Sequence, residues 1–324
     1  MKIFIAGATG AIGKRLVPLL VADGHQIFGM TRRQDRAAGL ATAGAQAVVA
    51  DALDRAAVLE AVMAARPDVV VHQLTAISHM RDLKHFDREF ALTNRLRTDG
   101  TENLLAAAKA AGVGRFVAQS YSGWPNPRTG GRIKTEDDPL DPAPPRYMRQ
   151  TLDAIRKLEQ LVNSVEGMTG IVLRYGGFYG PGTSMGEGGE FLEMIRRRKL
   201  PIFGSGAGVW SFLHIDDAAS ATRLAIERGP AGVYNVVDDE PAEVSTWLPE
   251  LARILGVRPP YRLPAWLGKL AIGEAGMSIM TQIRGSSNAK AKRILGWTPI
   301  YASWREGFRR GLSASPASVP LQHR

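Results

Sequence analysis

Gly7-Ala8-Thr9-Gly10-Ala11-Ile12-Gly13 is the stretch that decides the fold of this chain. It follows a short apolar run at residues 2–6 that predicts a buried strand, and it precedes apolar residues at helical spacing between 16 and 20. Glycines three residues apart allow a tight turn, close approach of the backbone to a pyrophosphate, and close packing of helix on strand. The free N–H groups at the helix start favour phosphate. The stretch therefore predicts a dinucleotide site.

The end of the second predicted strand, at residues 24–31, indicates which dinucleotide is bound. An acidic residue at this place would hydrogen-bond the ribose 2′-hydroxyl of NAD. The sequence has Thr31-Arg32-Arg33 instead, and arginine suits a 2′-phosphate. NADP is therefore favoured and NAD stays possible, although the two arginines also fit an ordinary basic surface.

Two further strand ends supply cofactor candidates. Asp51-Ala52-Leu53 follows a strand at residues 45–50, where Asp51 is placed to accept from the adenine amino group and Leu53 to flank the ring. Asp51 fits equally well as the cap of a helix at residues 55–65, and the sequence leaves both readings open. Gln73, Leu74 and Thr75 follow the strand at 68–72 and fall at the same edge of the sheet.

Strands and helices alternate through the first half of the chain. A helix is predicted at residues 86–112, a strand at 115–119, a helix at 149–165 and a strand at 170–174. This alternation predicts an α/β, Rossmann-type doubly wound parallel sheet. We expect a dinucleotide-binding domain at 1–175, a smaller substrate-binding part at 176–312 that interleaves with the sheet, and a disordered tail at 313–324. The Pro- and Gly-rich residues 124–145 predict a functional loop beside the site.

Composition excludes several classes of protein. The chain has 324 residues, of which 45% are hydrophobic, and it contains no cysteine. Disulfides and thiolate metal sites are thus excluded, and the six dispersed histidines indicate no metal site. We expect a cytoplasmic protein without a secretory signal or membrane span, because the N-terminus is already a strand and no apolar run reaches about 18 residues. The net charge of +10 comes from scattered residues, which argues against nucleic acid as a partner.

Taken together, these motifs resemble the extended short-chain dehydrogenase/reductases, the NAD-dependent epimerase/dehydratase family. The resemblance covers roughly residues 1–310 and extends beyond the glycine turn to several further motifs: Gly100-Thr101 with Asn103-Leu104-Leu105, Arg174 with Tyr179-Gly180-Pro181-Gly182, Phe212-Leu213-His214-Ile215-Asp216-Asp217, Tyr234-Asn235-Val236, and Leu295-Gly296-Trp297-Thr298-Pro299. It implies a Rossmann domain with a C-terminal substrate domain, a small-molecule substrate, and a homodimer built on four helices.

The chain departs from this family at the catalytic residues. The family uses a Tyr-x-x-x-Lys pair, in which the tyrosine moves a proton and the lysine lowers its pKa. Aligning Glu159 with the family's glutamate places Thr151 at the tyrosine and Ile155 at the lysine. The family's serine position, after the strand at 115–119, holds Tyr121, with Ser120 and Ser122 on either side.

Three readings follow from this departure. The first is an oxidoreductase or epimerase for a small carbonyl or sugar-like substrate, with Tyr121 as the acid, aided by Ser120 or Ser122. The second is a catalytically silent dinucleotide-binding sensor or scaffold. The third, a nucleic-acid-associated regulator, rests on net charge alone. For substrate binding we expect Arg174 and Tyr179, because their strand end and loop face the cofactor in a doubly wound sheet.

Overall fold

A computed structural model describes residues 1–77 and 82–313 of the chain. Seven parallel strands form its central sheet in the order β12-β7-β5-β4-β1-β2-β3. In chain order they are β1 (Lys2–Ala6), β2 (Gln26–Thr31), β3 (Gln46–Val49), β4 (Val69–His72), β5 (Arg115–Tyr121), β7 (Thr169–Tyr175) and β12 (Gly232–Val236). The order reverses between β1 and β4, and ligands of such sheets bind at that point, beyond the carboxyl ends of the strands. The predicted fold class is confirmed.

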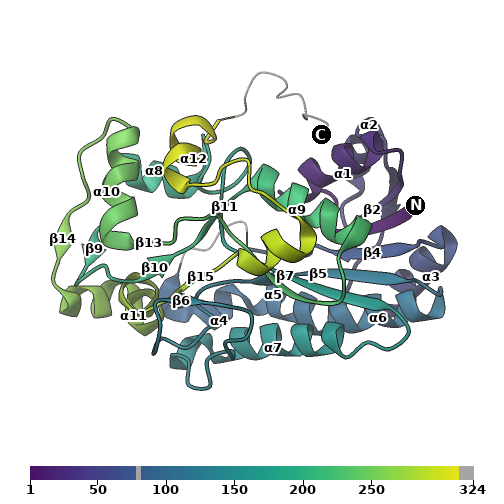
Figure 1. Ribbon diagram of the computed structural model, residues 1–324, viewed down its shortest axis with the longest axis horizontal. Coiled ribbons are helices and arrows are strands. Elements are labelled where there is room, and N and C mark those ends of the chain that lie inside the picture. The colour runs from purple at the N-terminus through teal and green to yellow at the C-terminus, as the bar shows by residue number, and fades with distance from the viewer. Residues whose placement is uncertain (78–81, 314–324) are drawn as a thin grey trace.

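Helices cover both faces of the sheet (Figure 1). Alternate residues of each strand point to opposite faces, so Ile3 and Ile5 pack in one core and Phe4 and Ala6 in another. The first core is covered by α1 (Gly13–Ala22) and α9 (Ile215–Arg228). The second is covered by α3 (Arg55–Ala65), α6 (Thr101–Ala110) and α7 (Arg149–Asn163). On the same face as α1 and α9 lie η1 (Gln34–Arg36) and α2 (Ala37–Thr42), whose Leu40 belongs to the first core.

The single helix predicted at residues 86–112 is wrong in detail, because the structure divides it. After η2 (Leu83–His85) come α4 (Phe86–Glu89), α5 (Ala91–Arg95), the π-helical turn η3 (Leu96–Gly100) and α6. The carbonyl of Leu96, where the π-turn begins, accepts a hydrogen bond from His72 Nε2 at 3.1 Å. Such π-turns interrupt a regular helix and are frequent at functional sites.

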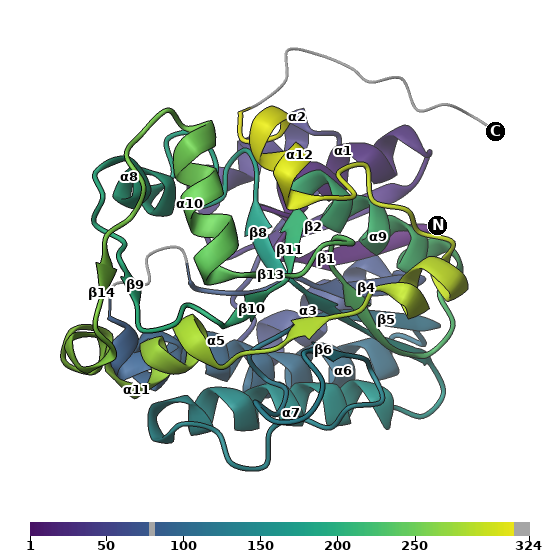
Figure 2. The ribbon, with the colours of Figure 1, turned by 60° about the vertical axis from the view of Figure 1, so that its left-hand side comes forward.

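A second, smaller group of elements follows β7 and lies at one side of the molecule (Figure 2). Its core contains Trp247, Phe212, Trp304 and Phe308. Its helices are α8 (Glu190–Arg196), α10 (Val244–Ile254), α11 (Ala265–Thr281) and α12 (Trp304–Arg310), with η4 (Arg146–Met148) and η5 (Ala291–Leu295) elsewhere in the chain. Short strands pair as β8 (Gly177–Tyr179) with β11 (Phe212–His214), β9 (Ile202–Phe203) with β14 (Arg262–Leu263), β10 (Val209–Trp210) with β13 (Ala242–Glu243), and β6 (Ile133–Lys134) with β15 (Gly285–Ser286).

The two parts are interleaved along the chain. After β8 and α8 have contributed to the smaller part, α9 and β12 return to the central sheet, where β12 pairs with β7. Asp217 of α9 then accepts hydrogen bonds from the backbone N–H groups of Ile300 and Tyr301, at 2.6 and 3.0 Å, and so ties the C-terminal segment to α9. The domain boundary at 175/176 stays a prediction. Within residues 1–77 and 82–313, no helix combines the length and apolar character that crossing a bilayer requires.

Candidate cofactor and substrate site

One large cavity, of about 1620 Å³, opens at the carboxyl ends of the central strands. It extends from the glycine turn after β1, past the ends of β2, β4 and β5, to residues of α8, α10 and α11. It thus joins the edge of the sheet to the smaller part of the chain. All fourteen predicted cofactor residues line it, namely Gly7, Thr9, Gly10, Ala11, Ile12, Gly13, Arg32, Arg33, Asp51, Ala52, Leu53, Gln73, Leu74 and Thr75.

The glycine turn has no room for side chains at two of its three glycines. Gly7 has φ +94°, and a Cβ there would lie 2.7 Å from the carbonyl oxygen of Gln73. A Cβ on Gly13 would lie 2.3 Å from the carbonyl oxygen of Ala8. The first turn of α1 has neither a side-chain cap nor an acidic residue, so no carboxylate competes with an anion for the positive end of this helix. This cradle fits the pyrophosphate of a dinucleotide.

The two predicted arginines at the end of β2 differ in their partners. Arg33 holds Asp35 through two contacts, Nε–Oδ1 at 3.0 Å and Nη2–Oδ2 at 2.5 Å, and this hydrogen bonding lowers the pKa of that carboxyl. Arg32 makes no ion pair with any residue that the structure describes. Arg32 is therefore the freer of the two cations to meet a phosphate.

Asp51 does not cap the helix after β3, which removes one of its two sequence readings. The cap is Asp54, whose Oδ1 accepts from the N–H groups of Ala56 and Ala57. Asp51 Oδ1 accepts from the N–H of Leu53 at 2.9 Å, within the cavity wall. The Asn103 side chain of α6 donates to the carbonyl of Ala52 at 2.9 Å and holds this segment in place. Nothing in the sequence pointed to that support.

His72 supports the cavity wall from behind and does not line it. Its Nδ1 accepts from the N–H of Leu74 and its Nε2 donates to the Leu96 carbonyl, which sets the neutral Nε2–H tautomer. Burial lowers the pKa of His72 to about 4. The ring therefore has a structural role: it fixes the turn that carries Gln73, Leu74 and Thr75. His79, a second histidine near this edge, lies outside the described residues.

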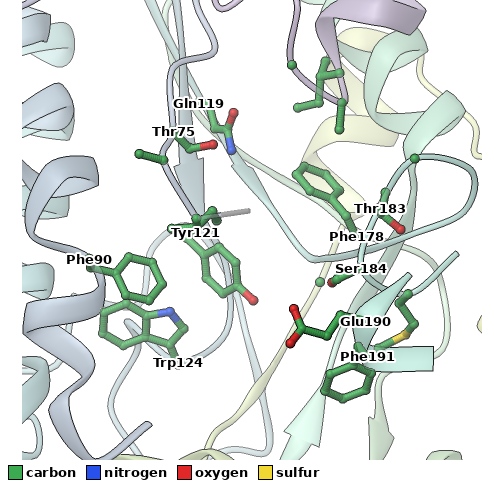
Figure 3. Close-up of a pocket in the computed structure, with 18 of the residues that line it drawn as sticks. Thr75, Phe90, Gln119, Tyr121, Trp124, Phe178, Thr183, Ser184, Glu190 and Phe191 are labelled. Atoms are coloured by element: carbon green, nitrogen blue, oxygen red, sulfur yellow. The ribbon is translucent and has the colours of Figure 1, made fainter. Parts of the chain in front are cut away.

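At the end of β5 the structure separates the three predicted catalytic residues. Tyr121 and Ser122 line the cavity and Ser120 does not. Strand alternation turns Ser120 toward α7, where its hydroxyl donates to Glu159 Oε1 at 2.7 Å. The Ser122 hydroxyl is hydrogen-bonded to the hydroxyl of Ser286 at 2.5 Å. The Tyr121 ring points into the cavity (Figure 3), and burial raises its pKa.

The expectation that Arg174 and Tyr179 line a substrate pocket is wrong. Arg174 is buried on β7 and forms an ion pair with Glu159 of α7. Tyr179 is buried in the core of the smaller part, with Phe308 edge-on to its ring. This stretch does reach the cavity, but the residues between the two that line it are Gly177 and Phe178.

Helix α7 contributes nothing to the cavity, although the structure describes all of its residues. The Thr151 hydroxyl donates to Asp87 Oδ1 at 2.7 Å and accepts from the Asn94 side chain at 3.1 Å. Ile155 packs in an apolar cluster with Phe86 and other residues. The two positions where the family's tyrosine and lysine are expected therefore have structural roles.

The far end of the cavity is an aromatic slot that sequence reasoning missed. One wall carries Phe90, Tyr121 and Trp124, and the opposite side carries Phe178 and Phe191 (Figure 3). Further rings come from β10 and α10, and the contributing segments lie far apart in the chain. The slot is defined by Phe90, Tyr121, Trp124, Phe178, Phe191, Trp210 and Trp247.

Charge also differs between the two ends of the cavity. Near the glycine turn and the end of β2 the lining includes five cations, Lys14, Arg15, Arg32, Arg33 and Arg36. At the slot end, the described lining residues include one cation, Lys199, and two carboxylates, Asp82 and Glu190. The first end suits a polyanion, whereas the second suits an apolar ring.

Comparison with known proteins finds relatives that match this chain over most of its length. Over 311 residues the chain is 46% identical to a 3-diazoavenalumate denitrifying reductase from Streptomyces sp, covering 96% of this chain and 100% of that one. It is 27% identical to a 4-hydroxy-2-methyl-3-oxo-4-farnesyl-3,4-dihydroquinoline-1-oxide ketoreductase from Stigmatella aurantiaca, over 91% of this chain and 85% of that one. Among solved structures, UDP-glucose 4-epimerase from Thermotoga maritima with UDP-glucose superposes with a TM-score of 0.74 at 24% identity, covering 96% and 97% of the two chains.

A family model also matches more than half of the chain. The model for the NAD dependent epimerase/dehydratase family covers residues 3–236, from β1 to the last strand of the central sheet. That span contains the glycine turn, all the strand ends that line the cavity, and Tyr121. On the sequence match and the sheet together, this chain belongs to the NAD dependent epimerase/dehydratase family.

Proposed function

We propose that this protein is an NADPH-dependent reductase that delivers hydride to a small aromatic substrate, with a diazo compound as the first candidate. The observation that carries the proposal is the single cavity that joins the glycine turn to the aromatic slot, with Tyr121 in its wall. A bound reduced nicotinamide supplies the hydride. The protein's own residues bind the cofactor and the substrate, orient them toward each other and exclude water from the cavity.

In this proposal the glycine turn and the strand ends bind the cofactor. The N–H groups at the start of α1 would hold the pyrophosphate, and Asp51 and Leu53 would meet the adenine. Arg32, which has no ion pair among the described residues, would meet a 2′-phosphate. No carboxylate stands at the end of β2 in its place, and this supports NADP over NAD.

The lining of the slot supports an aromatic substrate over a nucleotide sugar. Flat rings bind well between aromatic side chains, and the slot offers several. A nucleoside diphosphate needs cations to balance its charge, but the described slot end carries one lysine against two carboxylates. Epimerisation of a nucleotide sugar, as in the Thermotoga maritima enzyme, is therefore not our candidate.

A diazo substrate also accounts for the missing catalytic pair. The Streptomyces relative is named as a denitrifying reductase of a diazo compound and is 46% identical over its whole length. An arenediazonium ion that accepts hydride becomes the arene and releases N₂, so its carbon–nitrogen bond breaks, a carbon–hydrogen bond forms, and no proton is taken up. Such a reaction needs no Tyr-x-x-x-Lys pair, and α7 has none.

Reduction of a carbonyl group is the second candidate, and the position of Tyr121 favours it. Hydride addition to a ketone leaves an alkoxide, which must take a proton from an acid within reach. Gln119 and Tyr121 are the β5 residues that line the cavity, and of these two only Tyr121 has an acidic proton; its ring points into the slot (Figure 3). The ketoreductase from Stigmatella aurantiaca shows that relatives named for this chemistry exist.

The two candidates are separated by one set of assays. Purified protein with NADPH is offered an arenediazonium carboxylate carrying ¹⁵N in its diazo group, or an aryl ketone. NADPH oxidation is followed at 340 nm and ¹⁵N₂ by mass spectrometry, with reactions lacking protein as blanks. We expect ¹⁵N₂ in step with NADPH consumption, and activity that survives in Tyr121→Phe. Ketone reduction that Tyr121→Phe abolishes would favour the second candidate, whereas NADPH binding without turnover would favour a sensor.

Assembly and location are further parts of the proposal. We infer a homodimer in the cytoplasm, on the resemblance to extended short-chain reductases and the absence of cysteine from the sequence. Light scattering coupled to size-exclusion chromatography measures the mass directly. A mass near that of one 35.0 kDa chain would contradict the dimer.

A further inference from the structure

The C-terminal end of α8 carries a run of four cations, Arg196-Arg197-Arg198-Lys199. The first two form ion pairs with Glu187 and Glu193, and the third is engaged elsewhere in the fold. Lys199 makes no ion pair with any residue that the structure describes, and it is the one member of the run that lines the cavity. Its ammonium is therefore available to an anionic group of a bound molecule.

The turn that ends α8 fixes the place of Lys199. The N–H of Lys199 donates to the carbonyl of Met194 at 2.8 Å, in a helix-ending pattern that usually has glycine at the position of Arg198. Arg198 has φ +55°, a left-handed conformation that residues with a Cβ seldom adopt. Its Cζ lies 3.8 Å from the centre of the Tyr261 ring, and its Nε donates to the carbonyl of Pro259 at 3.0 Å. These two contacts hold the turn, so the fold directs Lys199 to the cavity wall.

One face of α8 forms a wall of the aromatic slot. Glu190, Phe191 and Met194 line the cavity from this helix, and Lys199 extends the same wall. Glu190 faces Tyr121 from the opposite side of the slot (Figure 3). Met194, whose carbonyl holds Lys199, is four residues, about 6 Å along the helix axis, beyond Glu190. The two charges of the wall therefore lie at opposite ends of α8, the carboxylate at the end that faces Tyr121 and the ammonium at the other.

The surroundings of Lys199 indicate what kind of anion it would bind. The five other cations of the described lining belong to α1 and to the segment after β2, at the cofactor end. Asp82, the second carboxylate of the slot, is already engaged by His85 at 2.6 Å. The lining residues that follow Lys199 in the chain are apolar, namely Leu200, Pro201 and Phe203. One ammonium on an apolar wall balances a single negative charge, which fits a carboxylate better than the nearly doubly charged phosphate group.

We propose that Lys199 binds the carboxylate of an aromatic acid whose ring occupies the aromatic slot. The inference rests on the proposed function in taking the slot as the substrate site, and it narrows the substrate class to aryl carboxylates. Glu190 repels an anion at its own end of α8, so the carboxylate is directed to Lys199 and the opposite end of the substrate toward Tyr121. The contact is a charge-assisted hydrogen bond, and no covalent bond is made or broken at Lys199. Lys199 thus determines specificity and orientation.

The test is the binding of aryl carboxylates, measured by isothermal titration calorimetry in the presence and absence of NADP⁺, which cannot deliver hydride. Benzoate, cinnamate and 5-phenylpenta-2,4-dienoate hold the carboxylate at increasing distances from the ring. Each acid is compared with its primary amide, which has nearly the same shape and no charge. We expect at least one acid to bind about fivefold or more tighter than its amide. Lys199→Met should bring that ratio close to one, and Lys199→Arg should retain most of it.

A matched control is available two residues earlier in the same run. Arg197 is 68% exposed and does not line the cavity, so Arg197→Met removes the same charge outside the slot and should leave the ratio unchanged. An equal ratio in folded Lys199→Met and the unmodified protein would overturn the proposal, as would three acids that bind no better than their amides. If Lys199→Met does not fold, Lys199→Gln is read in the same way. Because no turnover is measured, a preference for the acid that depends on Lys199 would stand even if the hydride transfer proposed above failed.

Discussion

Arg174 of β7 forms a buried, two-point ion pair with Glu159 of α7, with Nε–Oε1 and Nη2–Oε2 distances of 2.8 and 2.6 Å. Both side chains are at most 7% exposed. The Ser120 hydroxyl donates to the same carboxylate, so β5, β7 and α7 meet at one charged group. This pair fixes α7 against the sheet, and it explains why Arg174 is not free for a substrate.

Arg174→Met is expected to destabilise the protein by about 3–5 kcal/mol, because it leaves the Glu159 carboxylate buried without its partner. Urea unfolding followed by circular dichroism measures the loss. Arg253→Met is the control, since Arg253 is 63% exposed and solvent screens its pair with Glu250, so its loss should change the stability little. Equal losses in the two variants would contradict the structural role of Arg174.

Gly13→Ala is expected to weaken NADPH binding at least tenfold, because its Cβ would collide with the Ala8 carbonyl and displace the turn. Fluorescence titration of NADPH measures the affinity. Gly39 of α2 is the matched control, since a Cβ there meets nothing within 4 Å. Gly39→Ala should bind NADPH normally and gain about 0.5–1 kcal/mol of stability. Normal binding by Gly13→Ala would remove the glycine turn from the cofactor site.

Arg32→Ala is expected to weaken NADPH binding about tenfold or more, the value of a charge-assisted hydrogen bond of roughly 1.5–3 kcal/mol, and to leave NADH binding unchanged. Arg33→Ala should have a smaller effect on NADPH, because Arg33 is already paired with Asp35. Parallel titrations with both cofactors separate a contact to the 2′-phosphate from a general loss of charge. Equal losses for NADPH and NADH would contradict the NADP assignment.

His72 makes the stability of the protein depend on pH. Its pKa is lowered by burial to about 4, so between pH 6.5 and 4 the unfolded chain binds a proton that the folded chain does not. The contribution of His72 is therefore fully present above pH 6.5 and is lost as the pH falls toward 4. It amounts to about 3 kcal/mol. Urea unfolding at pH 7.0, 5.5 and 4.5 measures the free energy of unfolding, which should fall less with decreasing pH in His72→Gln than in the unmodified protein. An equal fall in both proteins would contradict this role.

Local patterns predicted the lining at the cofactor end of the cavity, but at the substrate end only Tyr121 and Ser122 among the predicted residues line it, for a physical reason. A glycine turn and the carboxyl ends of parallel strands are neighbours in every doubly wound sheet, so reading each strand end located the lining. The roles of Ser120 and Arg174 depend on a distant partner, Glu159, that no local spacing reveals. The aromatic slot likewise joins residues as far apart as Phe90 and Trp247, and only the folded chain brings them together.

The position of β12 in the sheet also sets an order for folding during synthesis. The strand that flanks β7 consists of residues 232–236, and the helix α9 that packs on α1 comes just before it. The ribosome must therefore synthesise the chain well past α8 before α9 can pack on α1 and complete that helix layer. Domains usually fold as units while the N-terminal part emerges first. The sheet of the cofactor half therefore stays partly uncovered until α9 and β12 have been synthesised, and both follow α8 of the substrate half. Neither half can then be exchanged between relatives as one continuous N- or C-terminal segment.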